Sequence, residues 1–242
     1  MRTLRFGWVI SGLLLAGCST TTVKSPDAPV PTSTFQLRIL HINDHHSRLA
    51  PDDGQVLRVD GKETDVILGG FPRVVSAFAH LRDPSIATLT LHAGDAITGD
   101  LYFTLFHGEA DADLMNQICF DAFEVGNHEF DAGDAGLKRF LDFLSKPIWQ
   151  CNTPVLGANV HPTVGVSPLS MFGAEDYLKP SIVIERDGTR IGIVGVDVAS
   201  KTKTSSSPDA GTQFEDERGA AQREIDTLRG QGIEHIVLMS HI

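Results

Sequence analysis

GDAITGDLYFTLFHGEADADLMNQICFDAFEVGNHEFDAG, residues 94–133, is the stretch on which the expected architecture depends. The apolar run at 86–91 directly before it predicts a strand, residues 111–118 predict a helix, and residues 122–125 predict another strand. Strands that alternate with a helix in this way are typical of an α/β domain.

The rest of the chain extends this pattern in both directions. Strands are expected at 35–42 and at 235–239, and a helix is expected over 72–81, where apolar residues recur at helical spacing. Hairpins are expected around the Asp-Gly pairs at 60–61 and 187–188, because Asp-Gly suits the tight turn between paired strands. Helix–strand units combined with hairpins predict an α/β fold with mixed β-sheets.

Composition limits the classes of partner. The 242 residues are 41% hydrophobic and 21% charged, as in an ordinary globular domain, and the formal net charge is −11. A nucleic acid polymer is excluded as a partner because binding its phosphate backbone requires a basic surface. An acidic protein can still act on a phosphate ester when bound cations supply positive charge locally.

The N-terminus has the features of an export signal. Arg2 and Arg5 precede an apolar run at 6–16 that is too short for a permanent membrane span, so residues 1–17 are expected to be a signal peptide. The run ends in Leu-Ala-Gly-Cys, which resembles the lipobox of bacterial lipoproteins and makes Cys18 the expected lipid-attachment site. The alternative is an ordinary signal peptide followed by a chance cysteine.

The segment after the lipobox is expected to be a tether. Residues 18–34 are rich in Ser, Thr and Pro, so they predict a flexible linker that precedes an ordered domain at 35–242. Because Ser19 rather than Asp follows the cysteine, the expected location is the periplasm, as an outer-membrane lipoprotein. Cys119 and Cys151 are either paired in that oxidising compartment or two buried free thiols, and the sequence leaves both possibilities open.

Polar residues with metal-binding side chains follow four predicted strands. The four segments are Asn43-Asp44-His45-His46, His92-Ala93-Gly94-Asp95, Gly126-Asn127-His128-Glu129-Phe130-Asp131 and Ser240-His241. Ligands of α/β sheets bind beyond the carboxyl ends of strands. Four such segments in one chain therefore predict a single site at the strand ends.

The residue types in these segments suit a divalent cation. In an extended chain Asp44 and His46 point to one side, where they can chelate a borderline metal, and His45 points to the other. Asp95 has two carboxylate oxygens that could bridge two cations, and Asn127 offers a neutral carbonyl oxygen. The alternatives are a solvated loop with a helix-capping Asp44, and an Asp95 that bonds only to its own turn.

A histidine next to these ligands has the features of a catalytic group. If a helix begins after Asn127, then Asp131 lies one turn beyond His128 and can accept a proton from one nitrogen of its ring. The other nitrogen then faces the substrate as a general acid or charge stabiliser. The remaining histidines outside these pairings are expected to be satisfied core residues: His41, His80, His92, His107, His161 and His235.

The segments ILHINDHH, LHAGD and VGNHEFDAG resemble those of the calcineurin-like metallophosphatases, and more narrowly those of bacterial 5'-nucleotidases. Residues 94–133 are especially similar to the NAD nucleotidases of that group. The resemblance covers about residue 37 to the end of the chain. It implies mixed β-sheets packed as a sandwich flanked by helices, with the C-terminal part of the fold missing.

The resemblance also implies a role for each site residue. It makes Asp44 and His46 ligands of one metal, Asp95 the bridging ligand, Asn127 a ligand of the other metal, His128 and Asp131 the catalytic dyad, and His241 the first of two later histidine ligands. Family members continue with a further G-H-x-H or G-H-x-Q motif and a domain that stacks the nucleobase. Because neither follows Ile242, we expect an incomplete domain that is a poor enzyme alone.

The implied function is hydrolysis of nucleotide phosphate esters outside the cytoplasm by two divalent metal ions (Zn, Mn, Co or Fe), with NAD pyrophosphate as a further substrate. One alternative is a phosphoesterase for cyclic nucleotides or nucleotide sugars. Another is a metal-binding lipoprotein without turnover. Metal identity, base specificity and oligomeric state are left open by the sequence.

Overall fold

The computed structural model describes residues 34–242, and Phe35–Ile242 form one compact unit. The signal peptide at 1–17, the lipid-attachment site Cys18 and the linker up to residue 33 lie outside the described residues. Within the described part, no helix combines the length and apolar character that crossing a membrane requires.

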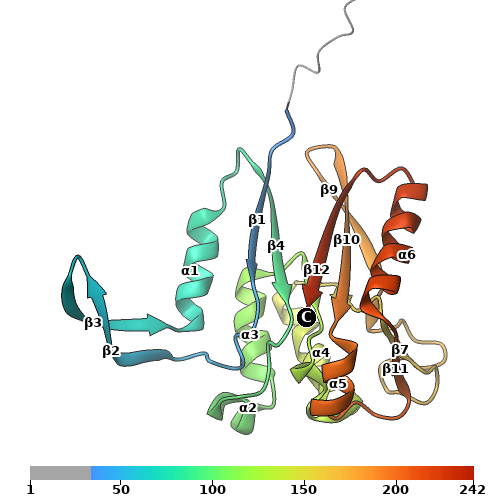
Figure 1. Cartoon of the computed structure of the whole chain (residues 1–242), viewed down its shortest axis with the longest axis horizontal. Helices are drawn as coiled ribbons and strands as arrows, with labels where there is room; N and C mark the ends of the chain where they lie inside the picture. Colours follow the sequence, from blue (N-terminus) through green and yellow to red (C-terminus); the bar gives the residue numbers. More distant parts are fainter. Residues whose placement is uncertain (1–33) are drawn as a thin grey trace, which may run out of the picture. The chain divides into compact units, whose positions relative to one another are not determined.

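Strands and helices alternate along the described chain (Figure 1). The strands are β1 (Leu37–Ile42), β2 (Pro51–Val59), β3 (Lys62–Gly69), β4 (Ala87–Ala93), β5 (Ala122–Glu124), β6 (Val155–Leu156), β7 (Val160–Pro162), β8 (Leu178–Lys179), β9 (Ser181–Arg186), β10 (Thr189–Asp197), β11 (Thr212–Phe214) and β12 (His235–His241). The helices are α1 (Phe71–Leu81), α2 (Leu101–Phe106), α3 (Glu109–Ile118), α4 (Gly133–Leu144), α5 (Ala199–Ser205) and α6 (Glu217–Gly230), with 3-10 turns η1 (His128–Phe130) and η2 (Pro147–Trp149).

Two sheets make up the centre of the unit. The larger has the order β1-β4-β5-β6-β8 and is parallel throughout, whereas the smaller has the order β12-β10-β9 and is mixed. In the larger sheet Ile42 pairs with His92 and Ala93 pairs with Glu124, so the carboxyl ends of β1, β4 and β5 lie at one edge. This alignment brings together the segments that follow these strands.

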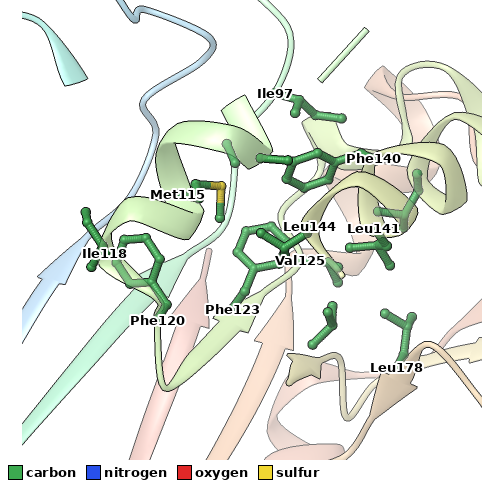
Figure 2. Packing of buried hydrophobic residues seen from close by; sticks show 14 of the residues in the cluster. Ile97, Met115, Ile118, Phe120, Phe123, Val125, Phe140, Leu141, Leu144 and Leu178 are labelled. Carbon is green, nitrogen blue, oxygen red and sulfur yellow. The ribbon is translucent and has the colours of Figure 1, made fainter. Parts of the chain in front are cut away.

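Apolar side chains pack the sheets and helices into four layers. Met115 of α3 and Phe140 of α4 pack on the outer face of the larger sheet beside Phe123 (Figure 2). Leu89 and Ile191 belong to the cluster between the two sheets. Helix α6 covers the far face of the smaller sheet through Ala221 and Leu228, which pack with Val194 and Val196 of β10. The expected α/β sandwich flanked by helices is confirmed.

Short elements are where the structure differs from the sequence prediction. Helices α2 and α5 and the short strands β6, β7, β8 and β11 were not expected, because each is too brief to show a hydrophobic period. The hairpin of β2 and β3 is present as expected, and its side chains are almost all exposed.

The structure pairs Cys119 with Cys151, which decides between the two possibilities that the sequence left open. Cys119 ends helix α3, and Cys151 lies between η2 and β6. The bond therefore ties the end of a core helix to the segment that enters the next strand.

Removal of this disulfide is expected to destabilise the fold. Because the bond joins positions 32 residues apart, a Cys119→Ser, Cys151→Ser double variant should lose about 2–4 kcal/mol of unfolding free energy, measured by urea denaturation. Reductant should lower the stability of the wild type to that of the variant and leave the variant unchanged. A wild type that is insensitive to reductant would contradict the pairing.

Candidate metal centre

The five side chains expected to bind metal lie together at the carboxyl ends of β1, β4, β5 and β12. His46 Nε2 is 3.5 Å from Asp44 Oδ1 and 3.6 Å from Asp95 Oδ2. His241 Nε2 approaches the same oxygen of Asp95 at 3.1 Å. Asn127, which is fully buried, directly precedes His128, whose backbone N–H donates to Asp95 Oδ1 at 2.8 Å.

Asp95 is the common member of two potential ligand groups. One consists of His46, Asp95 and His128, the other of Asp44, Asp95 and His241, and within each group the ligand atoms lie within 4.8 Å of one another. A carboxylate shared in this way has the position required of a bridging ligand. The grouping of His128 with His46 and Asp95 differs from the sequence expectation, which placed it only beside the metal ligands.

The segment after β1 faces the site for a different reason than expected. Asp44 and His46 both adopt positive φ, at 52° and 46°, so the chain turns here and is not extended. Their backbone N–H groups donate to the carbonyls of Gly94 and Asp95 at 3.0 and 3.1 Å. Asp44 and His46 still both face the candidate site, because the backbone of this turn is hydrogen-bonded to the adjacent loop after β4.

Two glycines allow the loops after β4 and β5 to come together. A Cβ on Gly94 would lie 2.8 Å from the Gly126 nitrogen, and a Cβ on Gly126 would lie 2.7 Å from the Asp95 nitrogen. Real Cβ atoms do not approach backbone so closely, and Gly94 also has φ of +83°. Both positions therefore require glycine if Asp95 is to reach the site.

Glu129 joins the same two loops, and sequence reasoning missed it. Its Oε2 accepts from the backbone of Asp95 and Gly126 at 2.8 and 2.6 Å, and its Oε1 accepts from Ala96 and Ile97 at 2.7 and 3.3 Å. Burial, together with the Asp95 charge, raises the pKa of Glu129 to about 7 despite these bonds. The only available signal was its place inside the GNHE segment.

Asn127 provides the test of whether the site fits a cation. Both Oδ1 and Nδ2 of this fully buried amide lack a hydrogen-bond partner among the described residues. Buried polar atoms are rarely left unpaired, so an unpaired amide oxygen beside Asp95 is explained if it binds a ligand. Carboxylate, imidazole and amide donors together suit a borderline divalent cation. The residues therefore fit the metals expected from the sequence.

His128 is supported as the sequence predicts. Its Nδ1 lies 2.6 Å from Asp131 Oδ2, and both side chains are about one-third exposed. The 3-10 turn η1 brings the two residues together in place of the expected helix. The His128 ring also meets the His46 ring edge-on, with 4.9 Å between the ring centroids.

His241 lies above buried carboxylates that the sequence did not single out. Burial lowers the pKa of His241, but its bonds to Asp95 and to the Ala93 carbonyl outweigh this and raise it to about 9. Its backbone N–H donates to Glu124 Oε1 at 3.2 Å. Burial raises the pKa of Glu124 well above its ordinary value and that of Asp197 to about 7. Buried acidic side chains thus lie close to the candidate metal ligands.

The expectation that the other histidines are core residues is wrong for most of them. His92 alone of the six is buried, and the exposed ones are His41, His80, His107, His161 and His235. Three of these lie on the strands β1, β7 and β12 and two near the ends of the helices α1 and α2, and periodicity alone did not reveal that they are exposed.

The two-sheet sandwich thus brings potential metal ligands from four strand ends into one site. The family model of the calcineurin-like phosphoesterases matches residues 37–194, and the chain belongs to this family.

Several relatives of the chain are nucleotidases. It is 42% identical to a probable 5'-nucleotidase of Treponema pallidum over 96% of its length, and 42% identical to an NAD 5'-nucleotidase of Haemophilus influenzae over 92%. It covers 36% and 34% of those proteins, about a third of each. The solved structure of the Haemophilus influenzae NAD nucleotidase superposes on 85% of the chain and 34% of that protein, with a TM-score of 0.76 and 45% identity. The 5'-nucleotidase precursor of Thermus thermophilus covers 86% of the chain, which spans 37% of that protein, with a TM-score of 0.72 and 32% identity.

Loss of one Glu129 acceptor oxygen is expected to destabilise the two loops. Glu129→Gln turns an amide toward backbone N–H groups that need an acceptor, so the free energy of unfolding should fall by about 1–3 kcal/mol in urea denaturation. Glu175→Gln is the control, because that side chain is 80% exposed and its loss should change stability little. Equal effects of the two substitutions would argue against a role of Glu129 in holding the two loops together.

Proposed function

We propose that the chain is part of an exported enzyme that hydrolyses the phosphate ester of 5'-nucleotides, with the pyrophosphate of NAD as a further substrate. The observation that carries the proposal is the convergence of potential metal ligands from four strand ends on Asp95, together with a His128 that Asp131 supports. The nucleotide substrate is supported by the names of the relatives, which are 42% identical to the chain.

Asp44 and His46 would hold one divalent cation, Asn127 and His241 the other, and Asp95 would contact both. When bound, the two cations supply positive charge for the phosphate oxygens and lower the pKa of a water molecule. The protein contributes the arrangement of the donors, since the Asp95 carboxylate accepts from the His128 backbone N–H and the Asp95 backbone N–H donates to Glu129. Preorganised donors of this kind need little rearrangement during the reaction.

His128 would act on the phosphoryl group directly. Because the Asp131 carboxylate accepts from Nδ1, the proton on that nitrogen is fixed and Nε2 is left for the substrate. From this position Nε2 would donate a hydrogen bond to a phosphate oxygen, or a proton to the leaving group. Such a donor requires a ring that carries a proton on both nitrogens.

Export is also part of the proposal. It is supported by the N-terminal basic and apolar segments, by the lipobox-like Cys18, and by the Cys119–Cys151 disulfide, since disulfides persist outside the reducing cytoplasm. We propose that Cys18 carries the lipid that anchors the protein to the outer membrane. Labelling of the expressed protein with radioactive palmitate, lost in a Cys18→Ala variant, tests this.

Hydrolysis of AMP, NAD and an aryl phosphate in the presence of Mn²⁺ or Zn²⁺ tests the function. Release of phosphate from AMP and cleavage of NAD by the protein that carries this domain would support the proposal. Cleavage of the aryl phosphate alone would indicate a phosphoesterase with a different substrate. No hydrolysis of any of the three would favour a metal-binding protein without turnover.

Substitution of His128 should separate catalysis from metal binding. In that protein His128→Ala should lower kcat for AMP by about 10²–10⁴-fold while the Mn²⁺ content stays the same. His107→Ala is the control, because His107 is exposed at the end of α2. An unchanged kcat in His128→Ala would remove this residue from the mechanism.

Substitution of Asp95 is expected to reduce the amount of bound metal. Asp95→Asn leaves a neutral amide between the two groups, and because an amide bridges two cations poorly, most of the bound metal should be lost. Metal content per chain, measured by mass spectrometry, checks this. Wild-type content in the variant would show that Asp95 is not the bridge.

A further inference from the structure

A buried chain of three side chains lies directly beneath the segment that carries Asp44 and His46. His45 Nδ1 is 2.9 Å from Nε2 of His92 on β4, and His45 Nε2 is 3.1 Å from Oδ1 of Asp111 on α3. His92 and Asp111 are fully buried, and the His45 side chain is 9% exposed. None of the contacts that place Asp95 or His128 involves these three residues.

The carboxylate sets the direction of one of the two hydrogen bonds in this chain. An ionised carboxylate only accepts, so His45 Nε2–H donates to Asp111. His45 Nδ1 and His92 Nε2 share the second hydrogen bond, in which one of the two nitrogens carries the proton. Burial, with the nearby charges of His45 and His241, lowers the pKa of His92 well below its usual value, which agrees with a neutral ring.

Aromatic rings enclose this chain and restrict how it can move. Phe71, at the start of α1, meets the His45 ring edge-on, with 4.8 Å between the ring centroids. His92 meets Phe120 and Phe123 in the same way, at 5.4 and 5.3 Å; both rings belong to the core cluster of Figure 2. The His45 ring therefore has one position in which its ring nitrogens are paired and its edges are packed.

His45 stands between two potential ligands, so its position determines theirs. Asp44 and His46 are both at positive φ, a region that side-chain-bearing residues rarely occupy without support. Backbone bonds to the neighbouring loop hold the segment from one side. The His45 side chain adds a second attachment, to His92 on β4 and Asp111 on α3.

We propose that Asp111, His45 and His92 form a buried bracket that positions Asp44 and His46 for binding a divalent cation. The inference rests on the proposed metal function and adds to it a set of positioning residues that do not touch the cation. Groups that orient the ligands of a metal commonly change its affinity about 10–100-fold when they are removed.

The test is the affinity of the 242-residue chain for Mn²⁺, measured by isothermal titration calorimetry well below the unfolding temperature of each variant. Asp111→Ala should weaken binding by about 10–100-fold. Asp111→Asn keeps an acceptor oxygen for His45 Nε2–H and should restore most of the affinity. His92→Phe removes the other bond in an aromatic-lined position and should weaken binding in the same direction, including when Asp111→Ala fails to fold.

Asn116→Ala is the matched control. Asn116 is also buried on α3, but its amide donates to the Leu144 carbonyl at 3.1 Å, away from the metal segment. Its loss should lower stability and leave Mn²⁺ affinity unchanged, which separates positioning from a general loss of structure.

Three results would overturn the bracket. One is wild-type Mn²⁺ affinity in both Asp111→Ala and His92→Phe, which would contradict the bracket but not the proposed metal binding. Another is a loss of Mn²⁺ affinity in Asp111→Asn as large as that in Asp111→Ala. That result would show that the charge of Asp111, and not its hydrogen bond to His45, determines the affinity. The third is a wild-type chain that binds no Mn²⁺, which would remove the proposed metal function itself and the bracket with it.

Discussion

The backbone approach between Gly94 and Gly126 is the constraint on which the candidate site depends. Neither position has room for a Cβ atom, and the two loops are held at this distance by Glu129, which accepts N–H groups from both. Asp95 follows the first glycine and Asn127 follows the second, so one backbone contact sets the distance between a carboxylate and an amide from different strands. The parallel register of β4 and β5 brings the two loops to the same edge before this contact forms.

Negative charge gathered at this contact explains why a cation suits the site. Asp95, Glu124, Glu129 and Asp197 are all buried, and burial is the leading cause of the raised pKa values of the last three. His241 supplies positive charge, and its raised pKa reflects how strongly the surrounding carboxylates favour a proton on its ring. A divalent cation would satisfy these carboxylates more completely than a proton does. Such a cation would also supply the local positive charge that an anionic ligand needs in a chain with a formal charge of −11.

The elements and the convergence of their ends could be predicted from sequence, because long hydrophobic periods and Asp-Gly turns are local signals. The four metal-type segments could be located for the same reason, since each directly follows a predicted strand. Glu129, Asp111 and His92 could not be recognised as support for the site, because their roles depend on contacts between segments far apart in the sequence. Examples are the Asp95–Glu129 bond at a separation of 34 and the His45–Asp111 bond at a separation of 66. The positive φ of Asp44 also escaped prediction, since a turn stabilised by a neighbouring loop leaves no mark in its own sequence.

Anomalous X-ray diffraction from crystals of the chain grown with Mn²⁺ tests the central claim most directly. The account predicts two anomalous peaks, each next to an oxygen of Asp95, with His46 beside one and Asn127 and His241 beside the other. Peaks on other faces of the domain, with the Asp95 carboxylate contacting only protein, would contradict it.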